Sequence, residues 1–247
     1  VALCAVVFGV VIRFYWAKAR GSTHDTWYHL HIADRIRREQ RLPDRVDQFL
    51  IPGPYDYPPG LHLLLAVFPS RVVSRFNWLF APFIEIVHIV ILIGVTYWLA
   101  QDLSTALVAG SIYATYTTQI VQFTVLTPRV LGSVLVSVLV LLVFYGFQIG
   151  AILPFVAAVG VGVVLLHTHK MSSQTVLFIF LFLSLLWIEP IYVALIIAMV
   201  MLSILVSGGH YLTILRGHIS IINFWRRQHN AGRSPGEFMR RYGIQGS

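Results

Sequence analysis

The segment VLGSVLVSVLVLLVFYGF, residues 130–147, decides the fold class because it contains no charged side chain. A helix that is apolar on every side is buried in a large core or spans a bilayer, which takes roughly 20 mostly apolar residues. The rest of the chain is similar: 57% of its 247 residues are hydrophobic and only 11% are charged. Soluble domains carry about 25% charged residues. The sequence therefore predicts an all-α, multi-pass integral membrane protein.

Seven segments are apolar enough to be candidate membrane spans: about 1–17, 76–99, 103–123, 130–147, 151–167, 172–188 and 190–207. They predict a transmembrane module over residues 1–207. The first connection, residues 18–75, is a large polar loop, whereas every other connection is only a few residues long. This asymmetry indicates that the chemistry lies in the first loop.

A tail follows the last predicted span, over residues 208–247. In this tail the apolar residues recur on one face of a helix, at Leu212, Leu215, Ile219 and Ile222. Such a pattern is typical of an amphipathic helix at a membrane surface. The pattern Ser234-Pro235-Gly236-Glu237 predicts a last short helix that ends at Gly243.

If the seven spans alternate, the loop 18–75, Arg129, the turn 167–170 and the tail all lie on one side. The opposite side then carries only three turns, which contain no Lys or Arg: Gln101–Asp102, Gln148–Gly150 and Glu189–Pro190. Every candidate site residue would therefore gather at one face of the membrane.

The positive net charge indicates which classes of ligand the protein could bind. The net charge is +8 and the basic residues are mostly arginines, whose planar fork suits phosphate or carboxylate. Pairing with lipid head groups explains single arginines equally well. No RNA- or DNA-binding motif is present, so no nucleic-acid partner is expected. Cys4 is the one cysteine, which excludes an intrachain disulfide and a thiolate metal site.

The stretch GSTHDTWYHLHIADRI, residues 21–36, places a carboxylate among histidines and aromatics. Ser22-x-x-Asp25 resembles a capping box that opens a helix ending near Gln40. On such a helix Asp25 and His29 share the inward face, so Asp25 is predicted to be a partly buried general base, and the pair is a candidate metal site. The alternative is that Asp25 only caps the helix. His24, Trp27 and His29 are the predicted substrate contacts beside it.

Two further groups are candidate substrate contacts. Tyr55-Asp56-Tyr57-Pro58-Pro59-Gly60 is a rigid turn that leads into a short interfacial or re-entrant helix, and its Tyr55 and Asp56 suit a loop lining a pocket. Arg129 lies at the N-terminus of a predicted span, where free N–H groups and a guanidinium suit a phosphate. Arg129 as a snorkelling interface residue is the alternative.

The turn at residues 167–170 concentrates cations on the same side. His167, His169 and Lys170 are predicted to give a second anion contact, or else to form an ordinary basic membrane turn. Glu85 and His88 lie three residues apart inside a span, where ionisable groups are costly, so they are expected to pair or to face inward.

The motifs HDTWYHLHIADRIR and YPPGLHLLLA, with the Pro- and Tyr-rich loop between them, resemble the GT-C glycosyltransferases. Asp25-x-Trp27-Tyr28-His29 is similar to the first-loop aspartate motif of oligosaccharyltransferase catalytic subunits. The resemblance implies a seven-span module with a large extracytoplasmic first loop, which binds a polyprenyl-linked sugar donor. It also implies that Asp25 binds a metal or deprotonates the acceptor.

The chain departs from that family in two places. The loop from Thr124 to Arg129 lacks the second acidic residue of the oligosaccharyltransferase group, and the large C-terminal domain of many relatives is missing. The sequence therefore requires no cofactor, while the resemblance allows Mg²⁺ or Mn²⁺. An arginine-rich loop outside the cytoplasm also conflicts with the positive-inside rule.

The expected function is transfer of a sugar from a polyprenyl phosphate or pyrophosphate carrier to an acceptor. Arg129, helped by Lys170, would hold the donor phosphate while Asp25 accepts the acceptor's proton. One alternative is a non-catalytic membrane subunit that binds lipid-linked or protein partners. The other is a proton-coupled transporter that uses Glu85, His88 and Glu189.

Overall fold

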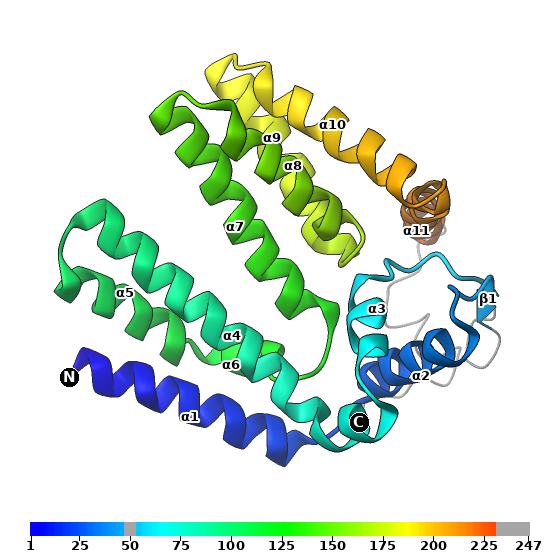
Figure 1. Cartoon of the computed structure of the whole chain (residues 1–247), viewed down its shortest axis with the longest axis horizontal. Coiled ribbons are helices and arrows are strands. Elements are labelled where there is room, and N and C mark those ends of the chain that lie inside the picture. The colour runs from blue at the N-terminus through cyan, green and yellow to red at the C-terminus, as the bar shows by residue number, and fades with distance from the viewer. Residues whose placement is uncertain (47–52, 231–247) are drawn as a thin grey trace.

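The computed structural model describes residues 1–46 and 53–230, and this part of the chain is almost entirely helical (Figure 1). The only strands described are Arg45–Val46 (β1) and Gly53–Pro54 (β2), which pair antiparallel within the first loop. The prediction of an all-α protein is confirmed apart from this short ribbon.

Four helices are long and apolar enough to cross a membrane: α1 (Ala2–Arg20), α4 (Ser70–Ala100), α7 (Pro128–Ile149) and α9 (Lys170–Trp187). Three further predicted spans are shorter apolar helices: α5 (Leu103–Thr115), α8 (Ile152–Leu166) and α10 (Ile191–Val206). At 1.5 Å per residue these three measure roughly 20–24 Å, less than the ~30 Å of a bilayer core. Each predicted segment thus contains a helix, and four helices have the length of a span.

The predicted continuous helix over residues 103–123 is wrong. Helix α5 ends at Thr115, Tyr116 adopts an extended conformation, and a separate helix α6 (Thr117–Phe123) follows. The guanidinium of Arg13, on α1, donates hydrogen bonds to the carbonyls of Tyr113 and Ala114. These last carbonyls of α5 therefore have partners from outside the helix, and the chain can turn there.

The helices form two groups, α1 with α4, α5 and α6, and α7 with α8, α9 and α10 (Figure 1). The main apolar core lies in the second group and is completed by Tyr211 and Ile214 of α11 (His210–Asn230). The turns that follow α4, α7 and α9 lie at one end of the molecule, and α2, α3 and α11 lie at the other (Figure 1).

The first loop folds into α2 (His24–Glu39) and α3 (Gly60–Val67), which pack against each other. The predicted cap at Ser22 is wrong, because Thr23 is the N-cap and its hydroxyl accepts a hydrogen bond from the Thr26 N–H. The predicted end of this helix near Gln40 is confirmed: Gln40 is its C-cap, with a φ of 54°.

Helix α3 is held against the α8–α9 turn by a close backbone contact. The N–H of Gly60 donates to the His167 carbonyl at 2.6 Å, and a Cβ at this position would lie 2.7 Å from the same oxygen. Only glycine allows this approach, so Gly60 joins the first loop to the second helix group.

The tail begins with two glycines and a helix, and its amphipathic character at a membrane stays a prediction. Gly208 and Gly209 both have positive φ, and α11 follows. The buried face of α11 contains Tyr211 and Ile214, whereas the predicted apolar stripe with Ile219 and Ile222 is exposed. A membrane surface would cover such a stripe. The predicted helix from Ser234 to Gly243 lies outside the described residues.

Candidate functional site

One polar pocket brings together Asp25 and Arg129, which lie far apart in the sequence. Its volume is about 370 Å³, and it lies between the end of α1, the start of α2, α6 and the start of α7. The lining residues are Arg20, Thr23, His24, Asp25, Val121, Gln122, Val125, Thr127 and Arg129. The predicted base and the predicted phosphate-binding arginine therefore share one cavity.

Asp25 is in the first turn of α2, and its side chain is exposed. Its predicted partial burial on the inward face is wrong. His29, Ile32 and Ile36 do form the buried face of α2, but the first turn borders the pocket, where the side chain of Asp25 is exposed. Trp27, on the same turn, is also exposed and does not line the pocket.

Both arginines of the pocket are held by α6. Arg129 donates to the Gln122 side chain at 3.0 Å, and Arg20 donates to the Val121 carbonyl at 2.6 Å. Neither guanidinium forms an ion pair with a carboxylate of the described residues. Two guanidiniums of the pocket are thus held in place without being neutralised by a carboxylate of the described residues.

A buried chain of hydrogen bonds runs through the folded first loop. The Tyr55 hydroxyl lies 2.6 Å from His62 Nδ1, and His62 Nε2 lies 2.8 Å from His29 Nδ1. Burial, together with repulsion from His169, lowers the pKa of His29 to about 4, and burial lowers that of His62 well below its usual value. Both imidazoles are therefore neutral at pH 7.

The two contacts couple the tautomers of the two imidazoles. Neutral His62 carries one ring proton, so it donates from one nitrogen and accepts at the other: either Tyr55 donates to Nδ1 and His62 donates from Nε2 to His29, or His29 donates to Nε2 and His62 donates from Nδ1 to Tyr55. His62 was not among the predicted site residues, although the predicted turn Tyr55–Gly60 leads directly to it.

Asp25 and His29 do not make a metal site in this arrangement. The Nδ1 atom of His29 is engaged with His62, its side chain is 3% exposed, and it does not line the pocket of Asp25. No group of three or more His, Cys, Asp or Glu side chains within residues 1–46 and 53–230 is arranged to hold a metal ion. We therefore assign no step to Mg²⁺ or Mn²⁺.

The cations predicted at the α8–α9 turn separate in the structure. Lys170 pairs with Asp56 at 3.4 Å and lies 5.9 Å above the Tyr57 ring, so its charge is already neutralised. His169 caps α9 by accepting from the Ser172 N–H, and burial with the nearby charge of Arg129 lowers its pKa to about 4.

His167 belongs to a different cavity. Its Nδ1 donates to the Val163 carbonyl at 2.9 Å, and the residue lines a groove of about 920 Å³. The groove runs between the first loop and the second helix group and is mainly apolar, with residues such as Leu63, Val164 and Val206 along it. It supplies the apolar surface that a lipid chain requires.

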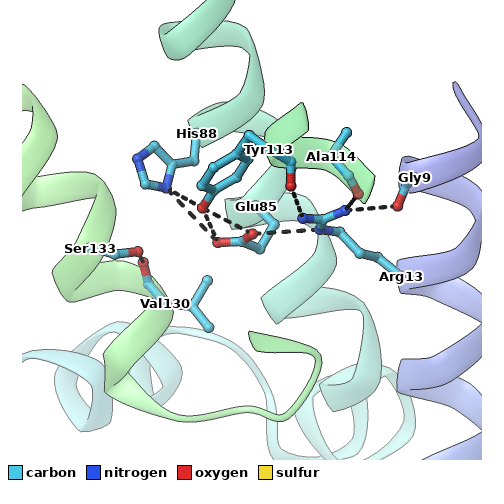
Figure 2. Close-up of polar contacts among 8 residues, drawn as sticks. All are labelled: Gly9, Arg13, Glu85, His88, Tyr113, Ala114, Val130 and Ser133. Atoms are coloured by element: carbon cyan, nitrogen blue, oxygen red, sulfur yellow. Dashed lines mark hydrogen bonds and ion pairs between the residues drawn. The ribbon is translucent and has the colours of Figure 1, made fainter. Parts of the chain in front are cut away.

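A second polar cluster lies inside the first helix group (Figure 2). The side chains of Arg13 and Glu85 are 1% and 0% exposed and approach to 3.5 Å. The Tyr113 hydroxyl donates to Glu85 at 3.2 Å and lies 2.8 Å from His88 Nδ1, and His88 Nε2 contacts Ser137. The predicted inward pairing of Glu85 and His88 is confirmed. Arg13 was missed, although a charge within the apolar segment 1–17 was a visible signal.

This cluster does not extend to Glu189, the third residue of the transporter alternative. Glu189 is exposed in the turn between α9 and α10, whereas the cluster lies on α1, α4 and α5 and reaches the second helix group only at Ser137 of α7. The cluster instead joins α1, α4, α5 and α7 by buried polar contacts.

Comparison with known proteins finds no match: no protein-family model, curated protein or solved structure is significantly similar to this chain.

Proposed function

We propose that this protein is a membrane glycosyltransferase that moves a sugar from a polyprenyl phosphate or pyrophosphate carrier to an acceptor. The observation that carries the proposal is the shared pocket of Asp25, Arg20 and Arg129. A carboxylate beside two unpaired guanidiniums matches a reaction in which a hydroxyl loses a proton and a phosphate leaves. The resemblance of the motifs HDTWYHLHIADRIR and YPPGLHLLLA to those of GT-C glycosyltransferases supports the same function.

The roles follow from the chemistry of the side chains. Arg129 and Arg20 bind the oxygens of the donor phosphate and stabilise the negative charge that develops on it as the sugar departs. Asp25 is exposed to the pocket and accepts the proton of the acceptor hydroxyl as that oxygen attacks the sugar. The lipid chain of the donor lies against apolar helix surface, for which the 920 Å³ groove is a candidate.

A non-catalytic subunit is the second candidate. It is favoured by one observation: the loop that contributes Thr127 and Arg129 to the pocket brings no second acid to Asp25. Such a subunit would bind the donor phosphate through the same arginines without transferring the sugar.

Donor binding and transfer by the purified protein in nanodiscs separate these candidates. Native mass spectrometry measures binding of a polyprenyl-phosphate sugar, and Arg129→Lys keeps the charge but loses the fork that grips two oxygens. We expect weaker donor binding by about 1–3 kcal/mol. Arg38→Lys, an exposed arginine of α2 outside the pocket, is the control. Donor binding without any transfer would favour the subunit, and equal binding by wild type and Arg129→Ala would remove the arginine from the site.

A further inference from the structure

Another cavity lies between the C-terminal half of α7, the C-terminal half of α9 and the start of α10. The turn between α9 and α10 is at the other end of the molecule from α2 and α11 (Figure 1). Its volume is about 410 Å³, within the ~300–1,000 Å³ typical of ligand pockets. The residues around it are Val140, Val143, Phe144, Phe147, Phe180, Leu183, Trp187, Glu189 and Tyr192. Aromatic rings and one carboxylate dominate this set.

The rings form a connected cluster around Tyr192. Its ring centroid lies 5.5 Å from that of Phe147, 5.6 Å from that of Phe180 and 6.0 Å from that of Trp187. An aromatic face carries negative electrostatic potential, and several faces around one space attract a cation. Such cages recognise ammonium groups, because an alkylated nitrogen is apolar enough to leave water and still carries charge.

Glu189 supplies the matching charge. Its carboxylate is close enough to act electrostatically on the Tyr192 hydroxyl, and it forms no ion pair with any residue of the described chain. The turns at this end contain no Lys or Arg that would neutralise it. A carboxylate without an ion-pair partner repels phosphate and attracts a cation, whereas a purely apolar ligand would make no electrostatic interaction with it.

We propose that this cavity is a binding site for an alkylammonium group, carried by a lipid head group or by a free organic cation. The site is independent of the proposed transferase pocket, because it lies at the opposite end of the helices and shares no lining residue with it. Of the residues that line the cavity, Tyr192 and Phe180 are buried, while Trp187 and Glu189 are exposed and accessible to a ligand.

The test compares choline with its uncharged isostere, 3,3-dimethylbutan-1-ol. The full chain is purified into phosphatidylglycerol nanodiscs, which contain no ammonium group, and ligand binding is followed by saturation-transfer difference NMR. We expect saturable binding of choline and at least about tenfold weaker binding of the isostere. Glu189→Gln and Trp187→Leu change exposed side chains, so the protein should remain folded while choline binding weakens.

Asp102→Asn is the matched control, since Asp102 is another acidic residue at this end, lies outside the cavity, and asparagine retains its role as N-cap of α5. Choline should bind this variant as it binds wild type. Repeating the titration in phosphatidylcholine nanodiscs identifies the source: weaker choline binding there indicates occupancy by the lipid head group, and unchanged binding indicates a free cation. Equal binding of choline and its isostere, no loss in Glu189→Gln, or no saturable binding would overturn the proposal.

Discussion

Asp25 and Arg129 show how much a single position contributes to the candidate site. Both side chains are exposed and are directed to their pocket by helix starts, Asp25 by the Thr23 cap of α2 and Arg129 by Pro128 at the start of α7. Because neither side chain packs in a core, each can be replaced with little effect on folding. Function can therefore be tested separately from stability at these positions.

Replacing Asp25 with Asn keeps its shape and removes its basicity. If Asp25 is the base, sugar transfer should fall by roughly 10²–10⁴, about 3–5 kcal/mol of barrier, while thermal stability changes little. Transfer to a labelled acceptor by the purified variants measures this. Asp44→Asn, an exposed aspartate of the same loop that does not line the pocket, is the control. Near-normal transfer by Asp25→Asn would leave Asp25 as part of the helix start only.

The buried His29 predicts a pH dependence of stability. Its pKa is about 4 in the folded protein and about 6.5 when exposed, so below pH 6.5 the unfolded chain binds more protons than the folded one. The stabilisation from this group is present above pH 6.5 and is lost as the pH falls towards 4. We expect the Tm to drop over this window, and to drop less in His29→Gln. An equal drop in Tm for wild type and His29→Gln over this window would contradict the assignment.

At the scale of elements, the cluster of Arg13, Glu85 and Tyr113 determines how α1, α4 and α5 meet. Arg13 donates hydrogen bonds to the last carbonyls of α5, and α6 begins directly after this helix end. Helix α6 then holds both arginines of the polar pocket through Val121 and Gln122. A buried charge in the first span is thus connected to the candidate site through the break in α5.

Breaking this buried pair on one side leaves an uncompensated charge. Arg13→Leu should destabilise the protein by about 3–5 kcal/mol, and Arg13→Leu combined with Glu85→Leu should cost less than the sum of the two single changes. Thermal unfolding in one detergent measures all four forms. Arg35→Leu with Glu39→Leu, an exposed pair on α2, is the control and should show coupling below about 1 kcal/mol. Additive effects at Arg13 and Glu85 would show that the pair is not coupled.

The whole molecule has two chemically different ends. One carries α2, α3, α11 and the polar pocket, and the other carries the acidic turns with the cavity beside Tyr192 (Figure 1). The first and second helix groups lie between these ends. This arrangement is expected if a bilayer covers the apolar helices in the middle of the molecule. The side of the membrane on which each end lies remains a prediction.

Labelling of single cysteines tests the predicted orientation. After Cys4→Ala, new cysteines at Ser22 and at Gln148 lie at the two ends of the molecule. A membrane-impermeant thiol reagent applied to intact cells should label position 22 and not position 148. A cysteine at Gln40, also in the first loop, should behave like position 22. Labelling of position 148 alone would reverse the orientation and agree with the positive-inside rule.

The sequence by itself determined the helical character and the approximate position of the apolar helices, because these depend on local composition and period. It also indicated Asp25 and Arg129, which local motifs mark. Only the tertiary structure decided that these two line one pocket, that His29 turns away to His62, and that Lys170 is paired with Asp56. The break at Tyr116 and the cavity beside Tyr192 were equally hidden, because each depends on how separate helices pack against one another. Apolar periodicity specifies which face of a helix is buried, but the partner of that face is selected by packing in three dimensions.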